Sequence, residues 1–143
     1  NDEYDRVYID TPPSFNFYSK SALIAADSVL IPFDCDSFAR QSLYSLLDNI
    51  SELQEDHNPE LEVEGIIINQ FSAQARLPGE LVAELEADGL PVFKSFLTSS
   101  VKMKESHRAH RPLIDLAPSH KLTGQFLDLH AELEQTVARI SAV

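Results

Sequence analysis

Continuous apolar runs alternate with amphipathic helical stripes along this chain. The clearest runs are Ser28–Phe33 and Leu61–Asn69, whose second half from Gly65 to Ile68 is wholly apolar apart from the glycine. Such runs are typical of parallel strands that are covered on both faces. The segments around them carry apolar residues at spacings of three and four, as helices do. The alternation predicts right-handed βαβ crossovers and an α/β fold with a mostly parallel sheet flanked by helices.

The whole chain, residues 1–143, is expected to form one domain, because no linker or repeat divides it. With 43% hydrophobic residues it can build a core. In chain order, the expected elements are a short buried strand at Val7–Asp10, a helix at Phe17–Ala26, the strand Ser28–Phe33, a helix capped by Asp36 or Ser37 that ends near Asn58, the strand Leu61–Asn69, a helix between Pro78 and Gly89, a fourth strand at Pro91–Leu97, a short helix from Ser100 to Ala109 and a long helix from Leu122 to Ile140.

The charge of the chain is unevenly distributed. Its net charge is −12, yet the segment from Lys94 to Lys121 holds six basic residues and two acidic ones, a net charge of +4. This asymmetry predicts a basic patch on an acidic body. The alternative is ordinary solvated charge on helices and loops, and composition alone does not separate the two.

The compartment is inferred from cysteine usage and from apolar run lengths. The single cysteine, Cys35, can form no internal disulfide, which favours a reducing cytoplasm and a buried structural thiol. The sequence has no apolar run near the roughly 20 residues that a membrane span needs, and no signal-peptide pattern. A membrane role is therefore not expected.

Asp10 is the first candidate for chemistry. The run Arg6–Ile9 ends in this carboxylate and continues into Thr11-Pro12-Pro13, which forces a turn. An aspartate at the end of a strand can hold Mg²⁺ through water, since Mg²⁺ keeps much of its hydration shell; otherwise it caps the turn. Asn69 ends another strand, where its amide suits a purine edge or forms a turn. The four glycines are isolated, so the chain contains no phosphate-binding loop.

Two histidines, His107 and His110, are spaced to share a helix face. No carboxylate or cysteine completes a metal-ligand set beside them, so a zinc site is not favoured.

Several blocks in a fixed order resemble the C-terminal part of ParA/MinD-type partition ATPases, the deviant Walker class of P-loop NTPases. The resemblance covers nearly the whole chain, from Tyr4 to about Glu134. The Walker B strand and switch II entry correspond to Tyr4–Ser14, and the helix and strand that follow correspond to Ser21–Pro32. The next crossover corresponds to Asn58–Asn69. The late basic segment corresponds to Val101–Ser106 and Arg111–Leu113.

The resemblance implies roles for individual residues. Asp10 is the implied catalytic carboxylate. It would face the attacking water, and it would bind Mg²⁺ through another water molecule. Five residues are implied to bind the nucleotide. Thr11 and Pro12 belong to switch II, and Asn69 lies near the adenine. Thr98 and Met103 belong to a segment that closes over the base. The implied nonspecific DNA-binding surface comprises four basic residues: Lys102, Lys104, Arg108 and Arg111.

The chain departs from the family pattern in three ways. The phosphate-binding loop with its signature lysine, and switch I, are absent, and in the family both precede the Walker B strand. The expected fold is therefore P-loop NTPase-like but incomplete, because the N-terminal P-loop strand is missing. Thr98 stands where relatives usually carry proline, and Gln74 stands where some carry arginine.

The function implied is that of a piece of an ATPase that partitions chromosomes or plasmids, or positions other cargo, through ATP-dependent dimerisation and nonspecific DNA binding. ATP and Mg²⁺ are the expected cofactors, and DNA and a ParB-like or other adaptor protein are the expected partners, in a bacterial cytoplasm at the nucleoid. The alternatives are a noncatalytic ParA-like interaction domain and a MinD-like or other deviant Walker ATPase. Residues 1–143 alone are expected to be inactive and to self-associate.

Overall fold

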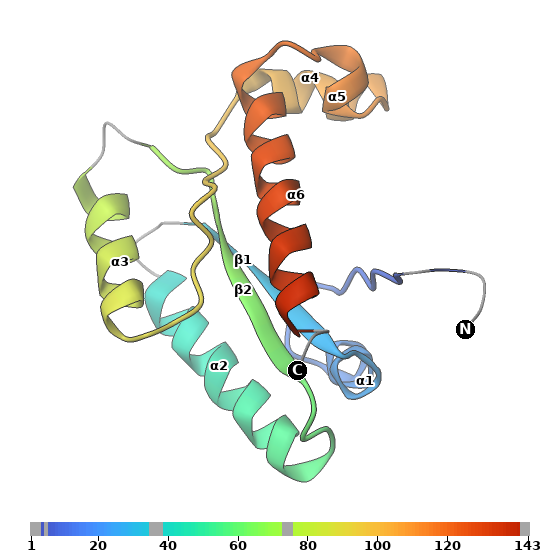
Figure 1. The fold of residues 1–143 in the computed structure, drawn as a ribbon, viewed down its shortest axis with the longest axis vertical. Helices are drawn as coiled ribbons and strands as arrows, with labels where there is room; N and C mark the ends of the chain where they lie inside the picture. Colours follow the sequence, from blue (N-terminus) through green and yellow to red (C-terminus); the bar gives the residue numbers. More distant parts are fainter. Residues whose placement is uncertain (1–3, 5, 35–38, 73–75, 141–143) are drawn as a thin grey trace.

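The computed structural model describes residue 4 and residues 6–34, 39–72 and 76–140 (Figure 1). Two strands and six helices are defined in these ranges. In chain order they are α1 (Phe17–Ala25), β1 (Ser28–Asp34), α2 (Ala39–Asp56), β2 (Glu62–Asn69), α3 (Arg76–Ala87), α4 (Val101–Ala109), α5 (Leu113–Leu116) and α6 (Lys121–Ile140).

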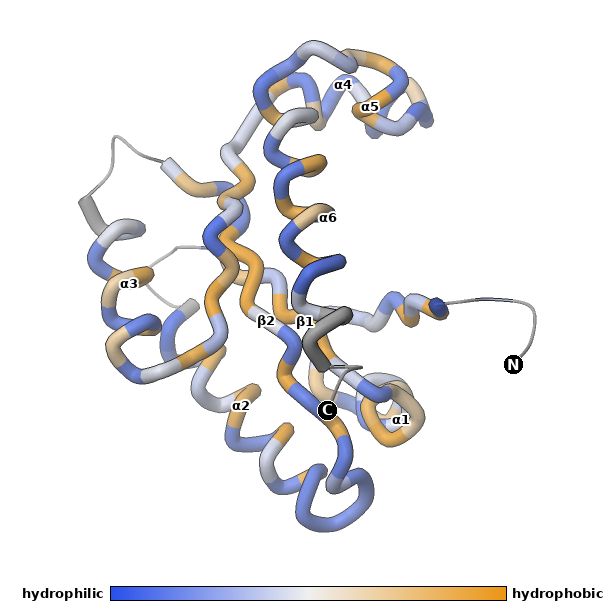
Figure 2. The backbone as a smooth tube through the Cα atoms, in the orientation of Figure 1, coloured by the Kyte–Doolittle hydropathy of each residue, from blue (hydrophilic) through white to orange (hydrophobic). Residues whose placement is uncertain are grey.

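The two strands form a parallel sheet joined by α2, so the predicted βαβ crossover is confirmed. The register pairs Ser28 with Glu62 and Asp34 with Asn69, and it shifts by one residue between Val29 and Leu30. Hydrophobic residues run along both strands (Figure 2). This continuous apolar character arises because helices cover both faces of the sheet.

One face of the sheet packs against α1, α2 and α3. Ile31 and Phe33 of β1 and Ile66 and Ile68 of β2 belong to this core, together with buried leucines and other apolar residues of the helices: Leu23, Leu43, Ile50, Leu53, Val82 and Leu85. The opposite face packs against α5 and α6 and the segment before α4, where the buried residues are Phe93, Leu97, Leu113, Leu122 and Leu129. The sheet therefore lies between two helical layers (Figure 1).

The prediction of a short buried strand at Val7–Asp10 is wrong. These residues form no strand, and Val7, Tyr8 and Ile9 are 70%, 67% and 52% exposed. A strand needs a neighbour for its backbone N–H and C=O groups, and within the described residues β1 pairs only with β2. We call residues 6–13 the N-terminal arm.

The predicted fourth strand at Pro91–Leu97 is also wrong as a regular strand, although part of its pairing forms. Ile66 N donates to Pro91 O and Phe93 N donates to Ile66 O, but the next bond to β2 comes from Leu97 N to Ile68 O. Lys94 and Ser95 are looped out of the ladder, and their amides donate to Glu132 of α6 at 2.8 and 2.9 Å. Helix α6 thus satisfies two of the backbone amides that the sheet leaves unpaired.

Side-chain caps define two of the predicted helices. Asn16 accepts hydrogen bonds from Tyr18 N and Ser19 N at the start of α1, a cap that was not predicted. Ser100 accepts from Lys102 N at the start of α4, as predicted. Gly89 follows α3 with φ +77°, which glycine adopts without strain. The predicted cap at Asp36 or Ser37 lies outside the described residues, and α3 begins at Arg76 rather than at Pro78.

Gly65 is required by the close approach of Phe93. A Cβ at position 65 would overlap the Phe93 ring, whereas a Cβ at Gly124 in α6 would meet nothing within 4 Å. We expect Gly65→Ala to lower the free energy of unfolding by about 2 kcal/mol or more through overpacking. Gly124→Ala, the matched control, should raise it by up to about 1 kcal/mol through helix propensity. Denaturant unfolding of both variants measures this, and an unchanged midpoint for Gly65→Ala would contradict it.

The exposed apolar arm and the outer edge of β1 predict that the 143-residue chain self-associates, because unpaired strand edges and apolar segments template pairing. Light scattering across a concentration series should show a mass that rises above the monomer. A double variant, Val7→Lys with Ile9→Lys, should shift this rise to higher concentration. A wild-type chain that stays monomeric at high concentration would contradict the prediction.

Candidate functional site

Polar side chains gather at the carboxyl ends of β1 and β2. The carboxylate of Asp34, the last residue of β1, accepts hydrogen bonds from Asn69 Nδ2 at 2.8 Å and from Gln70 Nε2 at 2.7 Å. The two strands end in register at Asp34 and Asn69. This is the edge at which open α/β sheets bind ligands.

The chain turns sharply after β2 and brings a third segment to the same edge. Gln70 has φ 51°, in the left-handed region, and Phe71 then forms an isolated parallel bridge with Thr98. The Thr98 amide and hydroxyl both donate to Oε1 of Gln125 in α6, at 3.1 and 2.9 Å. Asn69 and Thr98, which are far apart in the sequence, therefore lie at neighbouring positions of this edge.

Asp10, Thr11 and Pro12 lie on the exposed N-terminal arm. No hydrogen bond or ion pair that the structure records between described residues involves the Asp10 carboxylate, whereas the Asp34 carboxylate bonds to Asn69 and Gln70. The arm is held instead by Arg6, which forms a bidentate ion pair with Glu134 of α6. Hydrogen bonding to Tyr8, and then to Glu134, raises the pKa of Arg6.

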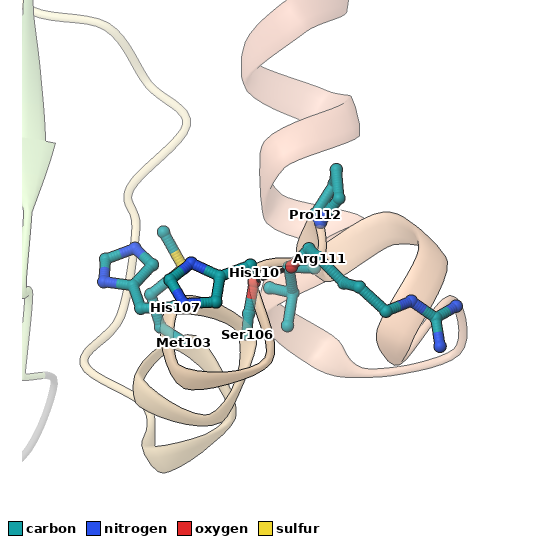
Figure 3. A pocket seen from close by; sticks show the side chains of 7 residues that line it. Met103, Ser106, His107, His110, Arg111 and Pro112 are labelled. Atoms are coloured by element: carbon teal, nitrogen blue, oxygen red, sulfur yellow. Dashed lines mark hydrogen bonds between the residues drawn. The ribbon is translucent and has the colours of Figure 1, made fainter.

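Met103 lies at an open hollow between α4 and α5. The hollow is lined by residues of these two helices and the turn that joins them: Met103, Ser106, His107, His110, Arg111, Pro112 and Leu113. Figure 3 shows the imidazole rings of His107 and His110 close to each other, with the Met103 thioether beside them and the Arg111 guanidinium pointing away. His110 is the left-handed cap that ends α4, with φ 49°, so it lies just beyond the helix rather than on it.

The four basic candidates are all exposed and lie on α4 or directly after it. Lys102 Nζ forms an ion pair with Glu105 Oε2 at 2.6 Å, and Arg111 Nη2 donates to the carbonyl of Asp115 at 3.4 Å. Lys104 and Arg108 form no ion pair that the structure records between described residues. Lys104 and Arg108, four residues apart, lie on the same side of α4 and are free to meet an anion.

The described residues contain no group of three His, Cys, Asp or Glu side chains that could hold a metal ion by themselves. Among the same residues, no helix is long and apolar enough to cross a membrane. Cys35 lies outside the described ranges.

Sequence reasoning missed three residues of this site: Asp34, Gln70 and Gln125. Asp34 carries a detectable signal, because it ends an apolar strand in the same way as Asp10. Gln70 takes a left-handed conformation that is uncommon outside glycine and asparagine. Gln125 gives no local signal, since its role arises only when α6 packs across the segment before α4.

Comparison with known proteins places this geometry in context. A family described as an AAA domain matches residues 1–63. The chromosome partitioning protein ParA of Myxococcus xanthus (strain DK1622) is 33% identical over 132 residues, which is 92% of this chain and 47% of the relative. The sporulation initiation inhibitor protein Soj of Bacillus subtilis (strain 168) is 30% identical over 131 residues, 91% of this chain and 52% of the relative. The chain spans about half the length of these curated relatives.

Solved structures agree on the fold. Apo McdA of Cyanthece matches with a TM-score of 0.73 at 20% identity, covering 90% of this chain and 51% of that one. Cobyrinic acid a,c-diamide synthase of Mycobacterium smegmatis, with bound ADP and magnesium, matches with a TM-score of 0.58 at 20% identity, covering 71% and 47%. At such identities the likeness shows the fold alone.

The parallel sheet between helical layers and these structural neighbours define an α/β fold that is P-loop NTPase-like. Within that class the sequence relatives are more specific. The chain is similar to ParA-type proteins over most of its length, and the resemblance seen in its ordered blocks is confirmed.

Proposed function

We propose that this chain is the C-terminal part of a partition or positioning ATPase that uses ATP and Mg²⁺. The observation that carries the proposal is the similarity to a chromosome partitioning protein over 92% of the chain. The clustering of polar groups at the carboxyl edge of the sheet supports it, because this edge is where α/β proteins of the class bind ligands. The cargo and the adaptor that stimulates hydrolysis are left open, with a ParB-like protein as the expected adaptor.

At the nucleotide, roles are proposed for residues of the N-terminal arm and of the sheet edge. The Asp10 carboxylate fits Mg²⁺ through water, since it is exposed and free of hydrogen-bond partners among the described residues. Thr11 and Pro12 follow it as the segment that senses the terminal phosphate. Asn69 and Thr98 flank the base, with Met103 beyond them on α4. Asn69 Nδ2 is already bonded to Asp34, so its Oδ1 is the atom offered to the nucleotide.

The supporting feature for DNA is the positive charge of α4 on an otherwise acidic chain. Lys104 and Arg108 are exposed, and Lys102 and Arg111 flank them. Such side chains neutralise phosphates without reading bases, so binding depends on salt and not on sequence. ATP-dependent dimerisation would place two such helices on one DNA molecule.

The DNA part of the proposal is tested with the longer protein that contains this chain, in the presence of ATP. Retention on DNA should weaken steeply as salt rises. Lys104→Gln should lower affinity for all sequences alike and reduce the salt slope by about one. Lys20→Gln on α1, outside the basic segment, is the matched control. Salt-insensitive retention, or none, would remove DNA from the proposed function.

The catalytic part is tested by comparing the 143-residue chain with the longer protein. Residues 1–143 should show no ATP turnover above background, because positioning and charge neutralisation of the phosphates come largely from a phosphate-binding loop that the chain lacks. In the longer protein, Asp10→Asn should lower kcat about a hundredfold or more. Asp27→Asn, in the exposed turn between α1 and β1, should leave kcat unchanged. Asp10-dependent turnover by the 143-residue chain would contradict the prediction.

A further inference from the structure

Helix α6 reaches across the segment before α4 with two polar side chains, seven residues apart. Glu132 accepts the amides of Lys94 and Ser95, and Gln125 accepts both the amide and the hydroxyl of Thr98. Residues seven apart lie on nearly the same side of a helix. Helix α6 therefore accepts hydrogen bonds from this segment at two positions, Gln125 and Glu132.

The Thr98 amide depends on Gln125 because the sheet does not use it. The neighbouring ladder bonds run from Leu97 N to Ile68 O and from Phe71 N to Leu97 O, each at 2.9 Å. Thr98 is half-buried, and so is Gln125. A half-buried amide without an acceptor is costly, so this one side chain fixes the orientation of the Thr98 peptide and hydroxyl.

The position of Thr98 affects both proposed surfaces. It pairs with Phe71, directly after Asn69 and Gln70, at the ligand edge of the sheet. Two residues later, Ser100 caps α4, which carries the basic side chains. A rotation at Thr98 would therefore move the base-facing edge and the start of α4 together.

We propose that Gln125 is a positioning residue for the nucleotide site, which holds Thr98 in the orientation that the adenine base meets. This inference rests on the proposed function. A proline ring fixes φ and has no N–H to satisfy, whereas Thr98 keeps its N–H and needs an external acceptor, which Gln125 supplies.

The test measures the affinity of the longer protein for ATP, by titration with a fluorescent adenine nucleotide, alongside its melting temperature. Gln125→Leu should weaken ATP binding roughly tenfold, the size expected when hydrogen bonds to a half-buried group are lost. Gln125→Glu keeps an acceptor oxygen and should stay within about twofold of wild type. Gln135→Leu, the same change at an exposed position of α6, is the matched control and should have no effect.

A double variant separates positioning from general packing. Thr98→Pro removes the amide that needs an acceptor, and the ladder bonds beside it do not use that amide. Adding Thr98→Pro to Gln125→Leu should therefore restore ATP affinity to within about threefold of wild type. A loss that the proline does not restore would assign Gln125 to packing and overturn the inference.

The outcomes also distinguish this inference from the proposed function. If the wild-type protein binds ATP and Gln125→Leu binds it equally tightly while the melting temperature falls, only the positioning role is overturned. If the wild-type protein binds no adenine nucleotide, the proposed function itself fails, and the positioning role fails with it.

Discussion

The need of backbone amides for hydrogen-bond acceptors shapes the region beyond β2. The sheet supplies acceptors for Phe93 and Leu97 but not for the residues between them. Helix α6 supplies acceptors for Lys94 and Ser95 through Glu132, and for Thr98 through Gln125. Without those side chains, the amides of Lys94, Ser95 and Thr98 would lose their recorded acceptors. The proposed nucleotide edge and the proposed DNA surface are thus both positioned by one helix.

The site is built from groups that restrain one another before any ligand arrives. The Asp34 carboxylate accepts hydrogen bonds from the side-chain amides of Asn69 and Gln70. These bonds fix the ends of both strands relative to each other. Such preorganisation lowers the conformational entropy that a bound nucleotide would have to overcome. Asp10 is the exception, because its arm is tied down at Arg6 and is otherwise exposed. The catalytic carboxylate of the proposal is therefore the least restrained group of the site.

The elements that could be predicted from sequence are those that a local pattern specifies. The apolar runs of β1 and β2 predict strands, and the caps at Asn16 and Ser100 follow from side chains that are near in sequence. Val7–Asp10 has the same kind of pattern and yet forms no strand, because pattern gives a segment the capacity to pair but not a partner. Pro91–Leu97 forms no regular strand for a related reason. Two of its backbone amides donate to Glu132, which is 37 or more residues away in the sequence.

The sequence by itself determined the candidates Asp10 and Asn69, the basic residues of α4 and the family that the chain resembles. Only the tertiary structure decided that Asp34 and Gln70 join Asn69, that Thr98 reaches the same edge, and that Gln125 holds it there. The physical reason is how far apart in the sequence the interacting groups lie. Apolar periodicity, capping and charge act within a few residues, whereas hydrogen bonds between a crossing segment and a helix depend on how the layers pack.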